Sequence, residues 1–449
     1  MLLHVPASLD GLLSLLASCF TQPTFQTFRA LVLGQVSQTG VRTVCGMLVG
    51  ARLAGVVHHS RAHRFFSNAR WCPDELGLRI LDMVVARLLD PGVALVVVID
   101  DTLLHRFGRK VHACFYHHDA TANSDSAAVA WGNNWVVAGV NVTLPFSERT
   151  VCLPVLFRLW QPRRKHIPKG KPDPERPSKL VLARDLVDLV AVRHPDRKVH
   201  TVGDAAYASG VFTGIGDRVT ITSRPRSNAA LYARKPPRTG KRGQPAKKGK
   251  RLPSLTQIAT DPATTWEQIT ATRYGKTEQL NVTTLRCLWP GAFKYTPIQL
   301  VLIQDTAKPS GYQLALITTD LNADAAELIE RYGDRWPIEV SFEEAKHLAG
   351  VGDARNRTKK AVERTVPFQF LCMTLTILWY AEAGHHPNVV AEHRARAPWY
   401  LTKATPSFAD MLAKLRRTII AAQYLPGRLD TPTPREITEV QTAWAAGGL

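Results

Sequence analysis

Acidic side chains follow two predicted strands and occupy one predicted helix late in the chain. Asp100 comes directly after the β-branched run Val93–Ile99, and Asp204 comes directly after Lys198–Gly203. Such runs predict strands buried on both faces. Together with Glu339, these carboxylates offer hard oxygen ligands for Mg²⁺ or Mn²⁺, and metal-assisted phosphoryl transfer uses two such ions about 4 Å apart. The alternative is structural, because aspartates commonly end strands by forming turns.

The segment around Glu339 has the periodicity of an amphipathic helix. Glu339 and Lys346 fall on one face, and Phe342 lies on another. Pro337 belongs in a first turn, so the helix is predicted to begin near residue 336. A surface helix with a Glu–Lys pair would have the same pattern. The segment leading into this helix carries Tyr332 and Arg335.

The charge of the chain indicates a polyanionic partner. Its 449 residues include 57 Lys and Arg against 37 Asp and Glu, a net charge of +20. An excess of this size favours nucleic acid and says nothing about fold. The longest apolar stretch, Val366–Ala381, is interrupted by polar residues and reads as a buried helix rather than a membrane span. The seven scattered cysteines are typical of reduced thiols in a cytosolic protein, without a zinc site or a disulfide framework.

Hydrophobic periodicity divides the chain into five predicted regions. The first is helical, and both a DNA-binding helix-turn-helix across residues 26–54 and a plain helical bundle are consistent with it. The third contains a basic arm with no acidic residue from Arg218 to Thr260, followed by predicted strands. The regions are 1–90 (helical N-terminal domain), 91–224 (first part of an α/β core), 225–320 (basic arm and β-rich insertion), 321–384 (second part of the core, with the Glu339 helix) and 385–449 (C-terminal helical region and tail).

The basic arm is predicted to bind DNA, and a solvated linker is the alternative. Its cations have no counter-charge in the sequence around them, which favours binding to a polyanion. The cations singled out for this role are Arg234, Lys235, Arg238, Lys241, Arg242, Lys247, Lys248, Lys250 and Arg251.

The chain resembles the DDE transposases of the insertion-sequence group across about residues 93–350. Asp100 and Thr102 stand as in its D-x-T motif, and Asp204 and Tyr207 as in its D-x-A/G-Y motif. The late segment is similar to the Y-x2-R-x3-E-x6-K signature of this group. Its four matching positions are Tyr332, Arg335, Glu339 and Lys346.

This resemblance implies an RNase H-like α/β fold: a mixed sheet flanked by helices, with a β-rich insertion and helical N- and C-terminal regions. It implies that Asp100, Asp204 and Glu339 hold two Mg²⁺ or Mn²⁺ ions. Arg335 and Lys346 would hold phosphates, and Tyr332 would contact the DNA backbone or stack nearby. Thr102 and Tyr207 are also expected to lie at the DNA. Asp101 competes with Asp100 for the first position, and Glu343 and Glu344 compete with Glu339.

In relatives, a tryptophan of the insertion stacks on a base flipped out of the DNA end. Trp266 and Trp289 are the candidates here, and packing within the insertion is the alternative for both.

The implied function is DNA transposition. The enzyme would cut transposon ends at their inverted repeats and join the 3′ hydroxyl to target DNA, as a homodimer on double-stranded DNA in the bacterial cytoplasm at the nucleoid. Two alternatives remain: an RNase H-like nuclease that cuts without joining, and a DNA-binding relative without catalytic activity.

Overall fold

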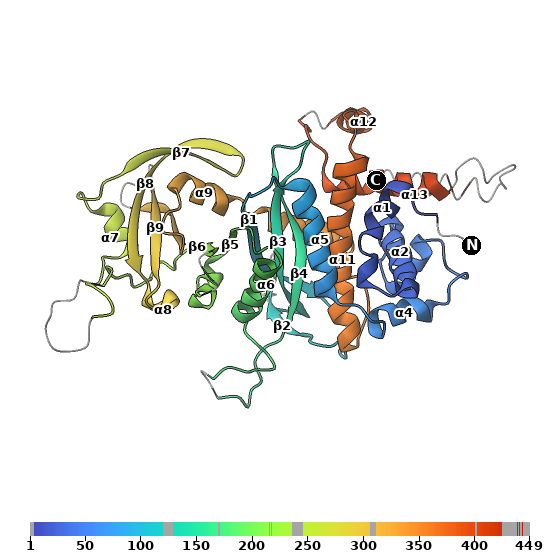
Figure 1. Ribbon diagram of the computed structural model, residues 1–449, viewed down its shortest axis with the longest axis horizontal. Helices are drawn as coiled ribbons and strands as arrows, with labels where there is room; N and C mark the ends of the chain where they lie inside the picture. The colour runs from blue at the N-terminus through green and yellow to red at the C-terminus, as the bar shows by residue number, and fades with distance from the viewer. Residues whose placement is uncertain are drawn as a thin grey trace.

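One mixed sheet runs through the molecule, seen in the computed structural model in Figure 1. The structure describes residues 4–119, 129–168, 171–214, 216, 218–235, 246–305, 311–399, 402–423, 438, 440 and 442. Across these residues the order of the paired strands is β2-β3-β1-β5-β6-β10-β9-β8-β7, and β4 also pairs with β3. The strands are β1 (Leu95–His105), β2 (Phe115–His118), β3 (Val129–Thr143), β4 (Thr150–Trp160), β5 (Val199–Gly203), β6 (Val219–Ser223), β7 (Glu267–Arg273), β8 (Lys276–Leu288), β9 (Pro297–Gln304) and β10 (Tyr312–Thr318).

The central part of this sheet has the RNase H-like arrangement that the sequence predicted. Strands β1, β3 and β4 pair antiparallel, and β5 and β6 continue the sheet parallel to β1. The helix α6 (Lys179–Arg193) covers one face, and α10 (Pro337–His347) with α11 (Lys359–Trp379) covers the other. Phe157 of β4 stacks on Phe370 of α11, with ring centroids 5.2 Å apart.

The predicted insertion extends the sheet of the core. Strand β10 pairs antiparallel with β6, and β9, β8 and β7 follow outward (Figure 1). Val202 of β5 belongs to one apolar cluster with Leu316 of β10 and Leu328 of α9 (Ala325–Gly333). Core and insertion therefore share hydrogen bonds and apolar packing. Two short helices, α7 (Leu255–Thr260) and α8 (Pro290–Phe293), flank these strands.

Helices from both ends of the chain pack together beyond α11 (Figure 1). The long helix α11 is almost entirely buried, as the apolar run predicted, and its core is continuous with that of the N-terminal helices. The N-terminal helices are α1 (Ala7–Ser14), α2 (Gln22–Ser37), α3 (Val44–Gly50), α4 (His59–Ser67) and α5 (Pro73–Leu88). The C-terminal helices are α12 (Val389–Arg396) and α13 (Phe408–Gln423).

The segment considered as a helix-turn-helix is formed by α2 and α3. Arg42, in the turn between them, is buried, and its side chain donates to the carbonyl of Gln35. A Cβ at Gly34 would lie 1.7 Å from the carbonyl oxygen of Met47, so only glycine permits this close approach of the two helices. The two helices thus pack as part of the core, and Arg42 does not face solvent. None of the described helices combines the length and apolarity needed to cross a bilayer.

Candidate active site on the central strands

The pairing of β1 with β5 places Asp100 beside Asp204. Ile99 and Gly203 form the last parallel pair, and the two aspartates come next on their strands. Strand β1 does not end there as predicted, because its antiparallel pairing with β3 continues to His105. Asp204 does end β5, where its side chain accepts a 2.9 Å hydrogen bond from the N–H of Ala206. The short 3₁₀ turn Gly210–Phe212 follows a few residues later.

Glu339 reaches the same site from α10. Pro337 occupies the first turn of this helix, as predicted, because its missing N–H costs nothing there. One turn further on, the hydroxyl of Ser341 donates to the carbonyl of Cys152 on β4 at 2.6 Å. This bond and the burial of Ile338 and Phe342 fix α10 against the sheet.

Arg335 joins the first and third carboxylates. One guanidinium nitrogen donates to Oδ2 of Asp100 at 3.0 Å, and another donates to Oε1 of Glu339 at 2.6 Å. Burial, with a smaller contribution from the charge of Asp204, raises the pKa of Asp100 to about 7, against the lowering effects of the hydrogen bond from the Asp101 N–H and of Arg335. Burial alone would lower the pKa of Arg335, but its two carboxylate partners raise it. The junction is thus a largely buried cation between carboxylates that repel one another without it.

Asp101 faces the other side of the sheet, since side chains alternate along a strand. Lys179 of α6 forms an ion pair with its Oδ2 at 2.5 Å, and the hydroxyl of Tyr207 donates to its Oδ1 at 3.2 Å. Asp101 therefore supports the packing of α6, and Asp100 is the one that faces Glu339. The sequence offered no signal for the role of Lys179, which lies far from Asp101 along the chain.

The other predicted motif residues surround this junction at different depths. Thr102, Tyr207 and Tyr332 are buried, so none of them offers a free surface to DNA. Lys346 is half-buried in the last turn of α10; burial lowers its pKa and the nearby charge of Asp119 opposes that change. Several residues of the predicted motifs thus have a packing role in the folded protein.

A divalent cation fits the chemistry of these carboxylates. Within the described part of the chain, no group of three or more His, Cys, Asp or Glu side chains is gathered tightly enough to hold a metal ion as it stands. The guanidinium of Arg335 lies between Asp100 and Glu339, where it offsets their charge. All three carboxylates offer the oxygen ligands that Mg²⁺ and Mn²⁺ prefer.

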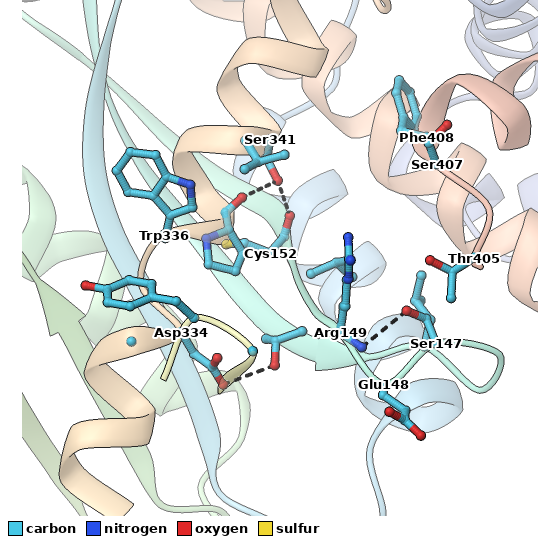
Figure 2. A pocket seen from close by; sticks show the side chains of 18 of the residues that line it. Ser147, Glu148, Arg149, Cys152, Asp334, Trp336, Ser341, Thr405, Ser407 and Phe408 are labelled. Carbon is cyan, nitrogen blue, oxygen red and sulfur yellow. Dashed lines mark hydrogen bonds between the residues drawn. The ribbon is translucent and has the colours of Figure 1, made fainter. Parts of the chain in front are cut away.

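A separate cavity of about 1320 Å³ is lined in part by residues of α10 (Figure 2). Trp336, Ser341 and Glu344 line it, whereas none of the three carboxylates of the junction is among its lining residues. Burial raises the pKa of Glu344 to about 7, and the charge of Glu343 adds to this effect. Glu344 thus belongs to the cavity, and Glu339 belongs to the junction.

The two tryptophans of the insertion differ in their surroundings. Trp289 is only 7% exposed and packs against Phe293, with ring centroids 6.0 Å apart. Trp266 is half-buried against the main core. Packing is thus the role that the structure gives Trp289. Trp336, which the sequence did not single out as a DNA contact, is more exposed than either of them, at 52%.

The basic arm begins beside Asp204. The hydroxyl of Ser223, the last residue of β6, donates to the carbonyl of Asp204 at 2.6 Å. Further on, Tyr232 forms bridges to Arg251 and Leu288, and Lys248 lies over its ring at 3.5 Å. Described cations of the arm are Arg234, Lys235, Lys247, Lys248, Lys250 and Arg251, whereas Arg238, Lys241 and Arg242 lie outside the described residues.

Comparison with known families supports this interpretation of the central strands. A family model described as DDE superfamily endonuclease matches residues 15–291, more than half of the chain. The match includes Asp100 and Asp204 and ends before the segment that carries Glu339. No curated protein matches the chain. The chain therefore belongs to the DDE superfamily endonucleases, enzymes of the nuclease and transposase type whose substrate is DNA.

Proposed function

We propose that the protein is a transposase that cuts the ends of a mobile DNA element and joins the new 3′ hydroxyl to target DNA. The observation that carries this proposal is the junction of Asp100, Arg335 and Glu339 beside Asp204. Asp100, Asp204 and Glu339 would hold two Mg²⁺ or Mn²⁺ ions. When bound, these ions activate a water or a 3′ hydroxyl and stabilise the departing oxygen.

The residues around the carboxylates orient the substrate. Arg335 offsets the charge of Asp100 and Glu339 in the free protein, and its planar fork of donors suits a phosphate when DNA is bound. Lys346, on the same helix, provides a second cation for the backbone of the DNA. The buried hydrogen bond from Ser341 to β4 keeps the α10 backbone in place while these contacts form.

The basic arm and the insertion supply contacts to the transposon end. The arm leaves the sheet next to Asp204, so DNA bound along it passes the carboxylates. Cations without counter-charges bind phosphates independently of sequence, and such contacts fix the position of a duplex. Joining requires both transposon ends at once, which calls for a homodimer on DNA at the nucleoid of a bacterial cell.

The competing function is an RNase H-like nuclease that cuts without joining, and a further alternative is an inactive DNA-binding relative. The extension of the sheet by β7–β10 favours transposition, because a nuclease that acts without end recognition needs no DNA-binding surface of this size.

The test is cleavage of a labelled duplex that carries the terminal repeat of the element, with Mg²⁺ or with EDTA. We expect nicking at the edge of the repeat with Mg²⁺ only. Asp100→Asn and Glu339→Gln should each reduce the rate by about a thousandfold or more while DNA binding persists. The neighbouring variants Asp101→Asn and Glu343→Gln serve as matched controls and should retain cleavage.

Each alternative gives a distinct result in this assay. Metal-dependent cutting without strand transfer to a second duplex would support the nuclease. Binding without cutting in any divalent cation would support the inactive relative. Loss of cutting in Asp101→Asn with retention in Asp100→Asn would overturn the assignment of the carboxylates.

A further inference from the structure

Two aromatic rings stand out into solvent where β1 and β2 meet the edge of the sheet. Phe107, two residues beyond the end of β1, is 96% exposed, and Tyr116, on the edge strand β2, is 74% exposed. Trp131 connects the two segments: its ring lies 5.1 Å from that of Tyr116, and its indole N–H donates to the carbonyl of Gly108, the residue after Phe107, at 3.3 Å. The rings therefore belong to one surface, and folding alone gives no reason to expose them.

Cations surround these rings. From Leu103 to His118 the sequence contains no Asp or Glu, and both Arg109 and Lys110 are exposed. A second loop, between α10 and α11, adds Arg355 and Arg357, which are also exposed. We call Phe107, Tyr116, Arg109, Lys110, Arg355 and Arg357 the edge surface.

Buried hydrogen bonds hold the two loops of the edge surface together. The guanidinium of Arg106, which is buried, donates to the carbonyls of Gly352 at 3.0 Å and Ala354 at 2.5 Å. The N–H of His112 donates to the carbonyl of Arg357 at 2.9 Å. A surface fixed in this way loses little conformational entropy when a ligand binds.

The edge surface is continuous with the catalytic junction. Strand β1 runs without interruption from Asp100 to His105, and Phe107 follows it. At about 3.3 Å per residue, Phe107 lies roughly 20 Å from Asp100 along the direction of β1, and Tyr116 lies on the edge strand β2 nearby. DNA that leaves the junction in this direction reaches them.

We propose that the edge surface binds unpaired DNA, with Phe107 and Tyr116 stacking on bases and the four cations contacting phosphates. In a duplex each base covers the faces of its neighbours, so exposed rings gain contacts only from bases that are unpaired. The source of the unpaired DNA rests on the proposed function, because cutting at a transposon end exposes single strands next to the junction. The binding itself does not require cleavage.

The test is the affinity of the full-length protein for a fluorescein-labelled dT20 strand and for a duplex of equal length, by fluorescence anisotropy in EDTA. We expect Phe107→Ala/Tyr116→Ala to weaken single-strand binding at least tenfold and to leave duplex binding within twofold. Phe107→Leu, which keeps an apolar side chain but no ring, should lose part of the single-strand affinity. Trp399→Ala removes a ring that is 72% exposed, close to the 74% of Tyr116, in the segment after α12, and it should change neither affinity.

The cations give a second, independent readout. Arg109→Ala/Lys110→Ala should reduce the slope of log affinity for dT20 against log salt concentration by about 1.4, as expected for two lost phosphate contacts. Equal loss of single-strand and duplex binding in the aromatic double variant would overturn the proposal, as would full retention of dT20 binding. Because EDTA prevents cleavage, a protein that fails to cut transposon ends still gives a decisive result here.

Discussion

Replacing Arg335 by alanine is expected to make the stability of the protein depend strongly on Mg²⁺. The guanidinium is 15% exposed and lies 3.0 Å from Asp100 and 2.6 Å from Glu339. Two opposite charges about 4 Å apart attract by about 4 kcal/mol at an effective dielectric constant near 20, and restored hydration offsets part of this. We expect a net loss of about 2 kcal/mol in the free energy of unfolding without metal, and a melting temperature lower by a few degrees.

The same change should strengthen Mg²⁺ binding. In the wild type a cation must compete with Arg335 for the oxygens of Asp100 and Glu339, whereas in the variant these oxygens are unpaired. Removing a competing interaction of about 2 kcal/mol corresponds to a tenfold or greater increase in affinity. Thermal unfolding in EDTA and across a Mg²⁺ titration at pH 8 measures both effects, with a larger metal-induced shift in the variant.

Arg273→Ala provides a matched control. Arg273 is 13% exposed and pairs with Glu278 in the insertion, so its loss should cost stability of similar size. Its response to Mg²⁺ should remain that of the wild type. If wild type and Arg335→Ala titrate with the same Mg²⁺ midpoint, Arg335 does not compete with the metal for these oxygens, and the reasoning about the junction is refuted.

Two further predictions concern packing and pH. Gly34→Ala should lower the free energy of unfolding by about 2–3 kcal/mol in urea denaturation, because the new Cβ meets the carbonyl of Met47, while Gly11→Ala, which has open space around it, should be neutral or stabilising. Glu344→Gln should remove a pH dependence: the folded pKa of about 7 exceeds the ordinary 4.5, so the wild type binds this proton more tightly when folded and loses stability as pH rises from 4.5 through 7. The variant should be more stable at pH 8 by about 2 kcal/mol after allowance for partial exposure, with little difference at pH 4; equal stability at pH 8 would contradict the burial of this carboxyl.

Local sequence patterns determined most of the elements and placed the candidate carboxylates after two strands and on one late helix. The β-branched run before Asp100 and the shorter one before Asp204 form adjacent parallel strands, and Pro337 begins α10 as its missing N–H predicts. The apolar run around Phe370 is a buried helix. These features follow from short-range periodicity and steric rules, which are present in any window of a dozen residues.

The tertiary structure decided which residues that are distant in the sequence are in contact. The alternation of side chains along β1 does not determine which of the two aspartates faces α10. The packing of α6 and α10 on opposite faces of the sheet determines it, because Asp101 pairs with Lys179 of α6 and Asp100 pairs with Arg335. The sequence suggested that Arg335 serves DNA, yet in the free protein it joins two carboxylates that lie far apart along the chain. Likewise, the insertion strands extend the sheet of the core because β6 has an open edge that pairs with β10. Such pairings depend on long-range complementarity of hydrogen bonds and apolar surface, and no local pattern encodes them.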